Sequence, residues 1–148
     1  MEFQNKEQKE KTFSFLRTLI FRLGLQKPQE KSGKTILITG STQGIGRETA
    51  KQLLRDPDNF VIFHGRNRSR CDNVTDWIAN QSDTARNFNC VVADFRSLAE
   101  VFRMSNEVSL KFPNLSVLHL NAHVINDESL YTEDGFEEQF QVRLSFAY

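Results

Sequence analysis

The sequence predicts an α/β fold in which a doubly wound parallel sheet is covered by helices on both faces. Three observations support this prediction. Short apolar runs rich in β-branched residues alternate with helical stretches from residue 34 onward, as in parallel strands joined by crossover helices. The runs are apolar on both sides, which is typical of strands buried on both faces. A glycine-rich turn joins the first run to the first helical stretch.

Apolar spacing and turn residues define each element of this fold in order. The strands are short apolar runs, and turns that contain proline, at residues 56–59 and 112–114, follow the first and third helices. Apolar residues three and four apart mark the helices, and in the last one Phe136, Phe140 and Leu144 are spaced by four. The expected strands are residues 35–39, 60–64, 89–93 and 117–120, and the expected helices are residues 45–55, 67–80, 98–111 and 132–148.

The composition is that of one globular domain. The chain has 148 residues, of which 39% are hydrophobic and 26% are charged, and its formal net charge is zero. A neutral chain gives no indication of a nucleic-acid partner. No apolar run approaches the roughly 20 residues that a membrane-spanning helix needs. We therefore expect a cytoplasmic protein.

Three segments precede the predicted domain, which occupies residues 34–148. Residues 1–12 form a polar tail, residues 13–25 form a basic amphipathic helix, and residues 26–33 form a linker. The amphipathic helix has two open interpretations. It lies on a membrane surface, which would make the protein peripheral to a membrane, or it docks on its own domain or in a partner's groove.

The glycine-rich turn predicts a phosphate site at the end of the first strand. A turn between a strand and a helix presents free backbone N–H groups, and the helix dipole adds about half a positive charge there. Gly40 allows the tight turn, Gly44 lets a pyrophosphate approach the backbone, and Gly46 lets the helix pack closely on the strand. Thr42, Gln43 and Ile45 complete the expected binding turn.

Arginine follows the second strand, at the place where an acidic residue would bind a ribose 2′-hydroxyl. Arg66 and Asn67 occupy this position, and Arg68 and Arg70 lie nearby. Because a guanidinium suits a 2′-phosphate, the sequence favours NADP(H) over NAD(H). The alternative is a solvated basic loop without a ligand.

Polar and small residues also follow the third and fourth strands. Asp94 can accept a hydrogen bond from an adenine amino group while Phe95 covers the ring, although Asp94 alone would also suit a turn or a helix cap. Asn121 can tie neighbouring strand ends together, and Ala122 leaves room for a cofactor ribose. His123 is a weak candidate for a general base, because a lone histidine near a loop usually has a structural role.

The two cysteines, Cys71 and Cys90, show no spacing typical of a metal site. We expect both to be free thiols in a reducing compartment rather than a disulfide framework. No metal site is predicted anywhere in the chain.

The sequence contains five motifs in order: Thr39–Gly46, Val61–Asn67, Val92–Phe95, Leu120–His123 and Asp134–Val142. Together they resemble the short-chain dehydrogenase/reductase family, and especially its retinol-dehydrogenase-like members that prefer NADP. The resemblance covers residue 34 to the C-terminus and implies a Rossmann-like fold with the strand order 3-2-1-4. It also implies hydride transfer between NADP(H) and an alcohol or carbonyl, with retinoid- or lipid-like substrates.

The residues that the family uses for catalysis are not matched. The family has an asparagine in its fifth helix, where Arg143 stands here, and then a serine and a Tyr-x-x-x-Lys motif. Neither Tyr131 nor Tyr148 has a lysine four residues later. We therefore expect no catalytic residue, a sheet truncated after about four strands, and an inactive short chain.

Such a chain would expose its fourth strand as an edge, which favours self-association. Three functions remain open: an oxidoreductase by ancestry, a non-enzymatic NADP-binding module, and an interaction module at a membrane surface.

Overall fold

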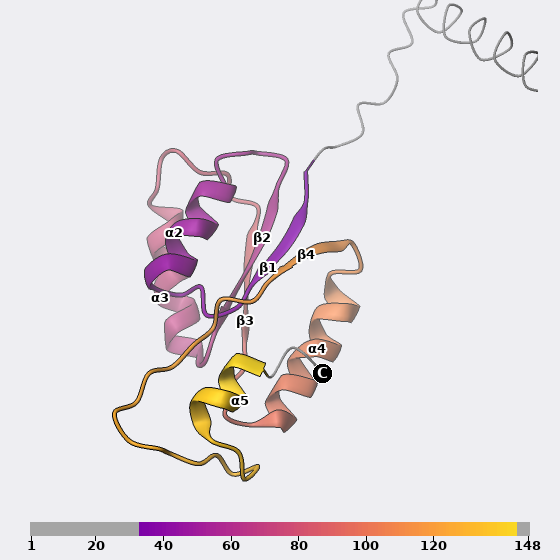
Figure 1. The fold of residues 1–148 in the computed structure, drawn as a ribbon. Helices are drawn as coiled ribbons and strands as arrows, with labels where there is room; N and C mark the ends of the chain where they lie inside the picture. Colours follow the sequence, from indigo (N-terminus) through magenta and orange to yellow (C-terminus); the bar gives the residue numbers. More distant parts are fainter. Residues whose placement is uncertain (1–32, 145–148) are drawn as a thin grey trace, which may run out of the picture. The chain divides into compact units, whose positions relative to one another are not determined.

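The computed structural model describes residues 33–144, which form a parallel sheet with helices on both faces (Figure 1). The α/β prediction is therefore confirmed. The predicted tail, amphipathic helix and linker lie outside the described residues. Within residues 33–144, every helix is too short or too polar to cross a membrane. The elements are β1 (Thr35–Ile38), α2 (Gly44–Leu53), β2 (Phe60–Gly65), α3 (Arg68–Ala79), β3 (Phe88–Val92), α4 (Leu98–Lys111), β4 (Leu115–His119) and α5 (Glu138–Leu144).

The sheet has the strand order β3-β2-β1-β4, and every neighbouring pair is parallel. This is the order implied by the family resemblance. Ile38 at the end of β1 pairs with Phe63 of β2 on one side and with His119 of β4 on the other. Because the strands are parallel and in register, the segments that leave β1, β2 and β4 start from the same edge of the sheet.

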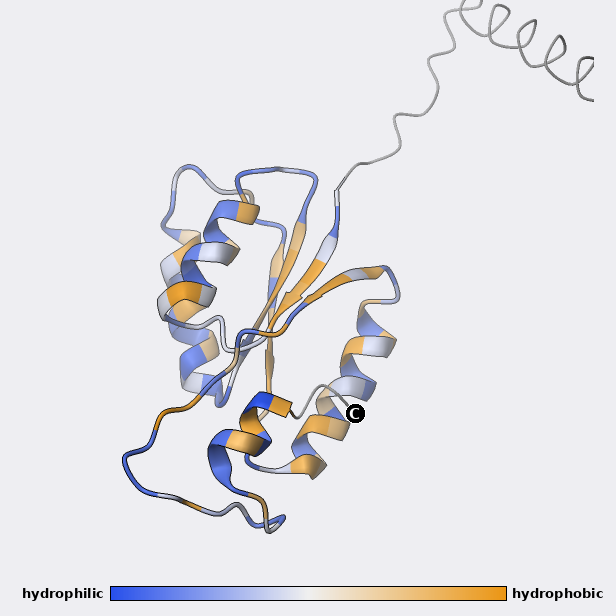
Figure 2. Ribbon diagram, viewed as in Figure 1, coloured by the Kyte–Doolittle hydropathy of each residue, from blue (hydrophilic) through white to orange (hydrophobic). Residues whose placement is uncertain are grey.

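The two central strands, β1 and β2, are largely buried because each face of the sheet has its own apolar core. Figure 2 shows that the strands are mostly hydrophobic in sequence. Helices α2 and α3 cover one face and α4 covers the other (Figure 1). In the first core, the Phe63 ring meets Phe88 edge to face at 6.0 Å. Successive strand residues point to opposite faces, so Ile36 and Ile38 join this core whereas Leu37 joins the second.

The predicted last helix, residues 132–148, begins six residues too early. The structure has a tight turn before α5, in which the Gly135 N–H donates to the Thr132 carbonyl at 3.0 Å and Gly135 has a φ of 82°. Tyr131 and Glu137 form an antiparallel bridge across this turn. The helix therefore begins at Glu138. Residues 145–148 lie outside the described part of the chain.

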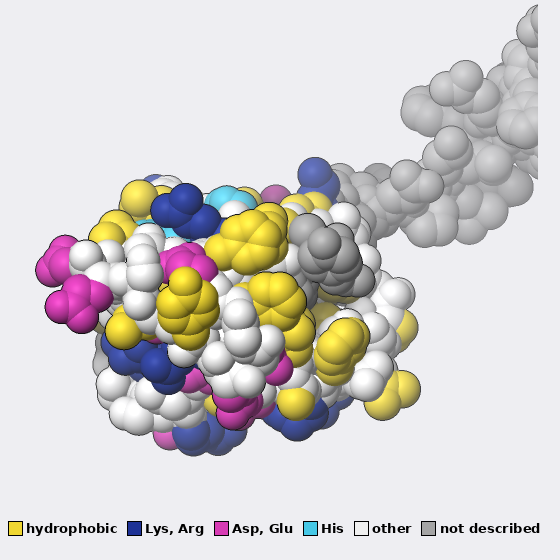
Figure 3. Space-filling model, turned by 60° about the horizontal axis from the view of Figure 1, so that its bottom comes forward, with side chains coloured by type: hydrophobic (Ala, Val, Ile, Leu, Met, Phe, Trp, Pro, Cys, Tyr) yellow, Lys and Arg dark blue, Asp and Glu magenta, His cyan; other side chains and the backbone are white. Residues whose placement is uncertain are grey.

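Several apolar side chains are exposed near α5 and β4. Phe136 and Phe140 are 46% and 55% exposed, and Leu118 of the edge strand β4 is 43% exposed. Figure 3 shows apolar side chains interspersed with charged ones on the face at the bottom of Figure 1. An exposed edge strand with apolar side chains favours association, and self-association stays a prediction.

Candidate functional site

A pocket of about 530 Å³ lies at the carboxyl ends of the strands. Of the twelve residues that the sequence predicts to bind a cofactor, only Asn67 lies outside its lining. The pocket is also lined by residues that the sequence analysis did not assign to a cofactor site, among them His64, Arg96 and Glu138. The predicted residues that line it are Gly40, Thr42, Gln43, Gly44, Ile45, Gly46, Arg66, Asp94, Phe95, Asn121 and Ala122.

The glycine turn has the backbone geometry that the sequence analysis required. Gly40 and Gly44 have φ values of 62° and 58°, in the left-handed region that favours glycine. A Cβ on Gly40 would lie 2.7 Å from the Ala122 Cα, whereas a Cβ on Gly44 would meet nothing within 4 Å. Gly40 is therefore needed for close packing, and Gly44 faces open space at the pocket.

The start of α2 is packed against the segment that follows β4. A Cβ on Gly46 would lie 2.5 Å from Asn121 Nδ2. This amide donates to the carbonyls of Thr39 at 3.0 Å and Gly40 at 3.2 Å. The Thr39 hydroxyl in turn accepts from the backbone N–H groups of Asn121 and Ala122, at 2.9 and 3.0 Å. Asn121 therefore ties the ends of β1 and β4 together, as predicted.

The N-terminus of α2 has no side-chain cap. Gln43 occupies the N-cap position, but its side chain makes no cap hydrogen bond, and the first turn contains no acidic residue. The Gln43 amide oxygen instead accepts from the Arg70 guanidinium on α3. Because the first N–H groups of a helix have no partner within the helix, this terminus can accept an anion from the pocket.

Two arginines bring positive charge to the pocket beside this terminus. Arg66 follows β2 and is exposed, and Arg70 lies in the first turn of α3. Within residues 33–144, no side chain forms an ion pair with Arg66. Asn67 lies outside the pocket and caps α3, where its side chain accepts from the Arg70 N–H at 3.0 Å. Arg68 points elsewhere and pairs with Asp72 at 3.1 Å.

Asp94 is already engaged by an arginine of its own loop. Its carboxylate accepts from the Arg96 N–H at 3.1 Å and from Arg96 Nε at 3.0 Å. Partial burial favours the protonated form of Asp94, but the hydrogen bonds from Arg96 hold the pKa of this carboxyl below its usual value. Phe95 is buried beside it. An aspartate side chain that accepts from the backbone N–H two residues later forms a common type of turn. This local pattern could have predicted the contact between Asp94 and Arg96.

His64 joins three strand ends beneath the pocket. Its Nδ1 accepts from the Gly40 N–H at 2.9 Å, and its Nε2 lies 2.9 Å from the Ala93 carbonyl. These two contacts require the neutral ring with the proton on Nε2. The ring also stacks on Phe95 at 4.1 Å. Burial lowers the pKa of His64 to about 4, against the raising effect of the Ala93 bond and of Asp94.

This role of His64 could not be predicted from the sequence, because a histidine inside a strand has no distinctive pattern. His123 lines the pocket rim, where Nδ1 lies 3.2 Å from the Asn121 carbonyl. Within residues 33–144, no three of His, Cys, Asp and Glu are grouped to hold a metal.

The prediction of free thiols is wrong, because Cys71 and Cys90 form a disulfide. Cys71 lies in the first turn of α3 and Cys90 lies on β3, with their Cα atoms 5.7 Å apart. This separation is within the usual range for a disulfide. Spacing along the chain could not predict the bond, because packing of α3 on β3 brings the two residues together.

Comparison with known proteins agrees with this geometry. The family model described as short chain dehydrogenase matches residues 34–145. Retinol dehydrogenase 14 of Mus musculus is 36% identical over 119 residues, which cover 74% of this chain and 35% of that protein. The WW domain-containing oxidoreductase of Drosophila melanogaster is 38% identical over 112 residues, which cover 74% of this chain and 27% of that protein.

Solved structures share the fold. The Pseudomonas aeruginosa RhlG/NADP active-site complex matches with a TM-score of 0.59 at 24% identity, over 74% of this chain and 41% of that one. An alcohol dehydrogenase from the archaeon Thermococcus sibiricus, complexed with 5-hydroxy-NADP, matches with a TM-score of 0.59 at 23% identity, over 75% of this chain and 47% of that one. The chain spans about a third of the length of the curated relatives it matches.

The lowered pKa of His64 predicts a stability loss in mild acid. Below pH 6.5 the unfolded chain takes up a proton on this histidine, whereas the folded chain does not until about pH 4. The free energy of unfolding should therefore fall between pH 6.5 and about pH 4, by up to about 3 kcal/mol from this group alone. Urea unfolding at a series of pH values measures it.

The matched control is His64→Asn, because an asparagine Oδ1 can still accept from Gly40 and does not titrate. The wild type should lose stability relative to this variant as the pH falls through that window. Parallel pH profiles for the two proteins would contradict the role assigned to His64.

Proposed function

Because the chain belongs to the short-chain dehydrogenase family of oxidoreductases, we propose that residues 33–144 bind NADP(H) in the pocket at the strand ends. One observation carries the proposal: the uncapped N-terminus of α2 and the arginine that follows β2 line the same pocket. The first supplies N–H groups for a pyrophosphate, and the second supplies a cation for a 2′-phosphate.

The pyrophosphate would lie against the start of α2. The open space at Gly44 lets a ligand approach the backbone, and the first turn contains no carboxylate that would repel phosphate oxygens. The contact between Gly46 and Asn121 holds the turn in place, so that its amides are preorganised for a ligand.

The 2′-phosphate would lie between Arg66 and Arg70. Arg66 is exposed and forms no ion pair within 4 Å among residues 33–144, and its charge acts on Asp94 only over a longer range, so its guanidinium is available to a ligand. Arg70 donates to Gln43, and this bond joins the glycine turn to α3 across the pocket. A guanidinium binds a phosphate through two parallel hydrogen bonds. NADH has a 2′-hydroxyl in place of the phosphate and therefore cannot form this pair of bonds.

The adenine would lie on the side of Asp94 and Phe95. Arg96 occupies part of the Asp94 carboxylate. We therefore infer that Asp94 accepts a hydrogen bond from adenine through the oxygen lone pairs that Arg96 does not use. Phe95 contributes apolar contact.

The substrate class is an alcohol or carbonyl compound. Relatives include a retinol dehydrogenase and a ketoreductase, which suggests a hydrophobic, retinoid- or lipid-like compound. The bound nicotinamide would supply or accept the hydride. Tyr131 is followed four residues later by Gly135 and not by a lysine. We therefore propose that residues 33–144 by themselves bind the cofactor without turnover.

Arg66 provides the sharpest test of the cofactor preference. Arg66→Gln should weaken NADPH binding by about tenfold or more, because a charged hydrogen bond contributes about 1.5–3 kcal/mol. NADH binding should change by less than about twofold. Arg68→Gln is the matched control, because Arg68 lies two residues further along the chain and pairs with Asp72. An equal loss for both nucleotides would contradict the 2′-phosphate assignment.

Turnover separates a binding module from an enzyme. We expect no oxidation of NADPH above background when the full chain is mixed with retinal or a small aldehyde, because Tyr131, the tyrosine among residues 33–144, has Gly135 and not a lysine four residues later. The decrease in NADPH absorbance measures this. Turnover that follows protein concentration and is lost in Gly44→Val would refute the proposal of binding without catalysis.

A further inference from the structure

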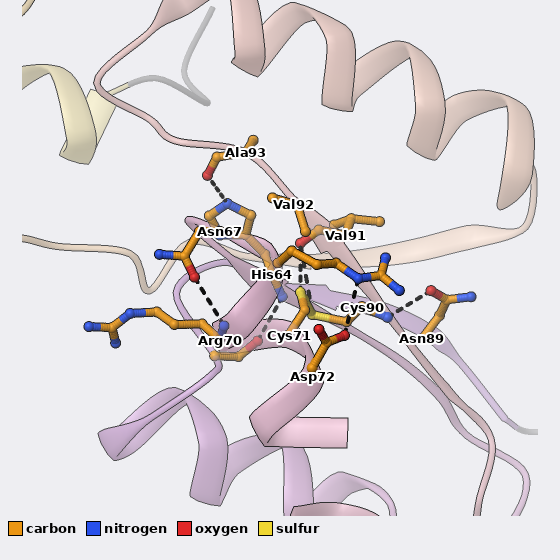
Figure 4. The surroundings of a disulfide bond; sticks show 12 residues. His64, Asn67, Arg70, Cys71, Asp72, Asn89, Cys90, Val91, Val92 and Ala93 are labelled. Atoms are coloured by element: carbon orange, nitrogen blue, oxygen red, sulfur yellow. Dashed lines mark hydrogen bonds and ion pairs between the residues drawn. A yellow bond between two sulfur atoms is a disulfide. The ribbon is translucent and has the colours of Figure 1, made fainter. Parts of the chain in front are cut away.

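The disulfide between Cys71 and Cys90 lies beside the candidate cofactor pocket. Figure 4 shows the bond with His64, Asn67, Arg70 and Ala93 around it. It joins the first turn of α3 to β3, across 19 positions of sequence. Cys71 directly follows Arg70, one of the arginines that line the pocket. A chemical change at the sulfur atoms therefore acts on the element that carries the arginine.

The Cys71 sulfur is also packed against the end of β2. A Cβ on Gly65 would lie 3.3 Å from Cys71 Sγ and 2.7 Å from the methyl carbon of Thr42, so little free space separates the three residues. Two thiols that are not bonded need more room than a disulfide does. In a packed interior this room is found only by displacing neighbours, and here the neighbours are residues of the pocket wall.

The two cysteine residues differ in burial. Cys71 is 3% exposed, whereas Cys90 is half-buried. A thiolate can therefore attack Cys90, with Cys71 as the leaving group. After reduction, the Cys71 thiol would find an acceptor already in place, because Sγ lies 3.4 Å from the Val91 carbonyl.

We propose that Cys71 and Cys90 are a reversible dithiol–disulfide couple, and that its reduction weakens NADP(H) binding by releasing the start of α3 from β3. This inference rests on the proposed cofactor site. In the disulfide form, Arg70 is attached to β3 through its neighbour Cys71. In the reduced form, the first turn of α3 retains its Asn67 cap and the apolar contacts of Val74, and it loses its one covalent attachment.

The reductant is a dithiol, and the reaction balances. One thiolate of the reductant attacks Cys90 Sγ and forms a mixed disulfide, while the Cys71–Cys90 bond breaks and Cys71 leaves as a thiolate that takes up a proton. The second thiol of the reductant then attacks the reductant sulfur that is bonded to Cys90, and Cys90 leaves as a thiolate that takes up a proton. The protein gains two electrons and two protons, and the reductant becomes a cyclic disulfide.

The effect should differ between the two nucleotides. Arg66 lies in the loop before α3 and Arg70 lies in its first turn. The glycine turn contacts Arg70 through Gln43 but is also held by Asn121 and His64. The bonds of Asn121 and His64 do not depend on the disulfide. Reduction should therefore weaken NADPH, which has the 2′-phosphate, more than NADH, which lacks it.

The experiment compares the full chain before and after treatment with dithiothreitol, which is then removed by gel filtration under nitrogen. Alkylation in denaturant followed by mass measurement should find no free thiols before treatment and two after. Fluorescence titration should show the NADPH dissociation constant rising by at least about fivefold on reduction. The NADH constant should change by less than about twofold.

Cys90→Ser is the matched control, because it prevents the bond at the more exposed position. Its NADPH affinity should equal that of the reduced wild type and should not respond to dithiothreitol. If the wild type binds NADPH equally in both forms, or has two free thiols before reduction, the proposed couple is wrong while the proposed function stands. If neither form binds NADPH although the thiol counts change as expected, the proposed function itself fails, and with it any control of NADPH binding.

Discussion

The close packing between Gly46 and Asn121 is the constraint on which the rest of the site depends. The loops that leave a parallel sheet carry backbone groups that no neighbouring strand satisfies, and buried groups of this kind need other partners. Asn121 supplies donors to the Thr39 and Gly40 carbonyls, and His64 supplies an acceptor to the Gly40 N–H. These side chains fix the turn, so the amides at the start of α2 remain open to the pocket. Because side chains satisfy the backbone groups of the turn, the first N–H groups of α2 remain free to bind an anion.

Much of the fold could be predicted from the sequence because its signals are local. Helix α4 has the predicted bounds, since its apolar spacing is regular and Pro113 follows it. The strands deviate by one or two residues at their ends, where apolar character alone does not fix the boundary. The start of α5 was missed because Gly135 and its neighbours close a turn through bonds with Thr132 and Phe136, and helical spacing does not reveal such a turn.

The site was predicted in part for a similar reason. The glycine turn and the residues after each strand have fixed positions relative to the strand ends, and parallel pairing brings those ends together. The contributions of Arg96, His64 and the Cys71–Cys90 pair depend on side chains from different elements meeting in three dimensions. The stacking of His64 on Phe95 and the disulfide between α3 and β3 produce no regular spacing of residues in the sequence. Asn67 is expected to bind the cofactor, whereas in the structure it lies outside the pocket and caps α3.

The most direct test of the account is amide NMR of the ¹⁵N-labelled chain during a titration with NADPH. The central claim is that the N–H groups at the start of α2 hold the pyrophosphate. The amide signals of Gly44, Ile45 and Gly46 should therefore shift most, and they should do so with NADH as well at higher concentration. If saturating NADPH leaves these three signals unmoved, the amides do not bind the cofactor, and the pocket is only a feature of the fold.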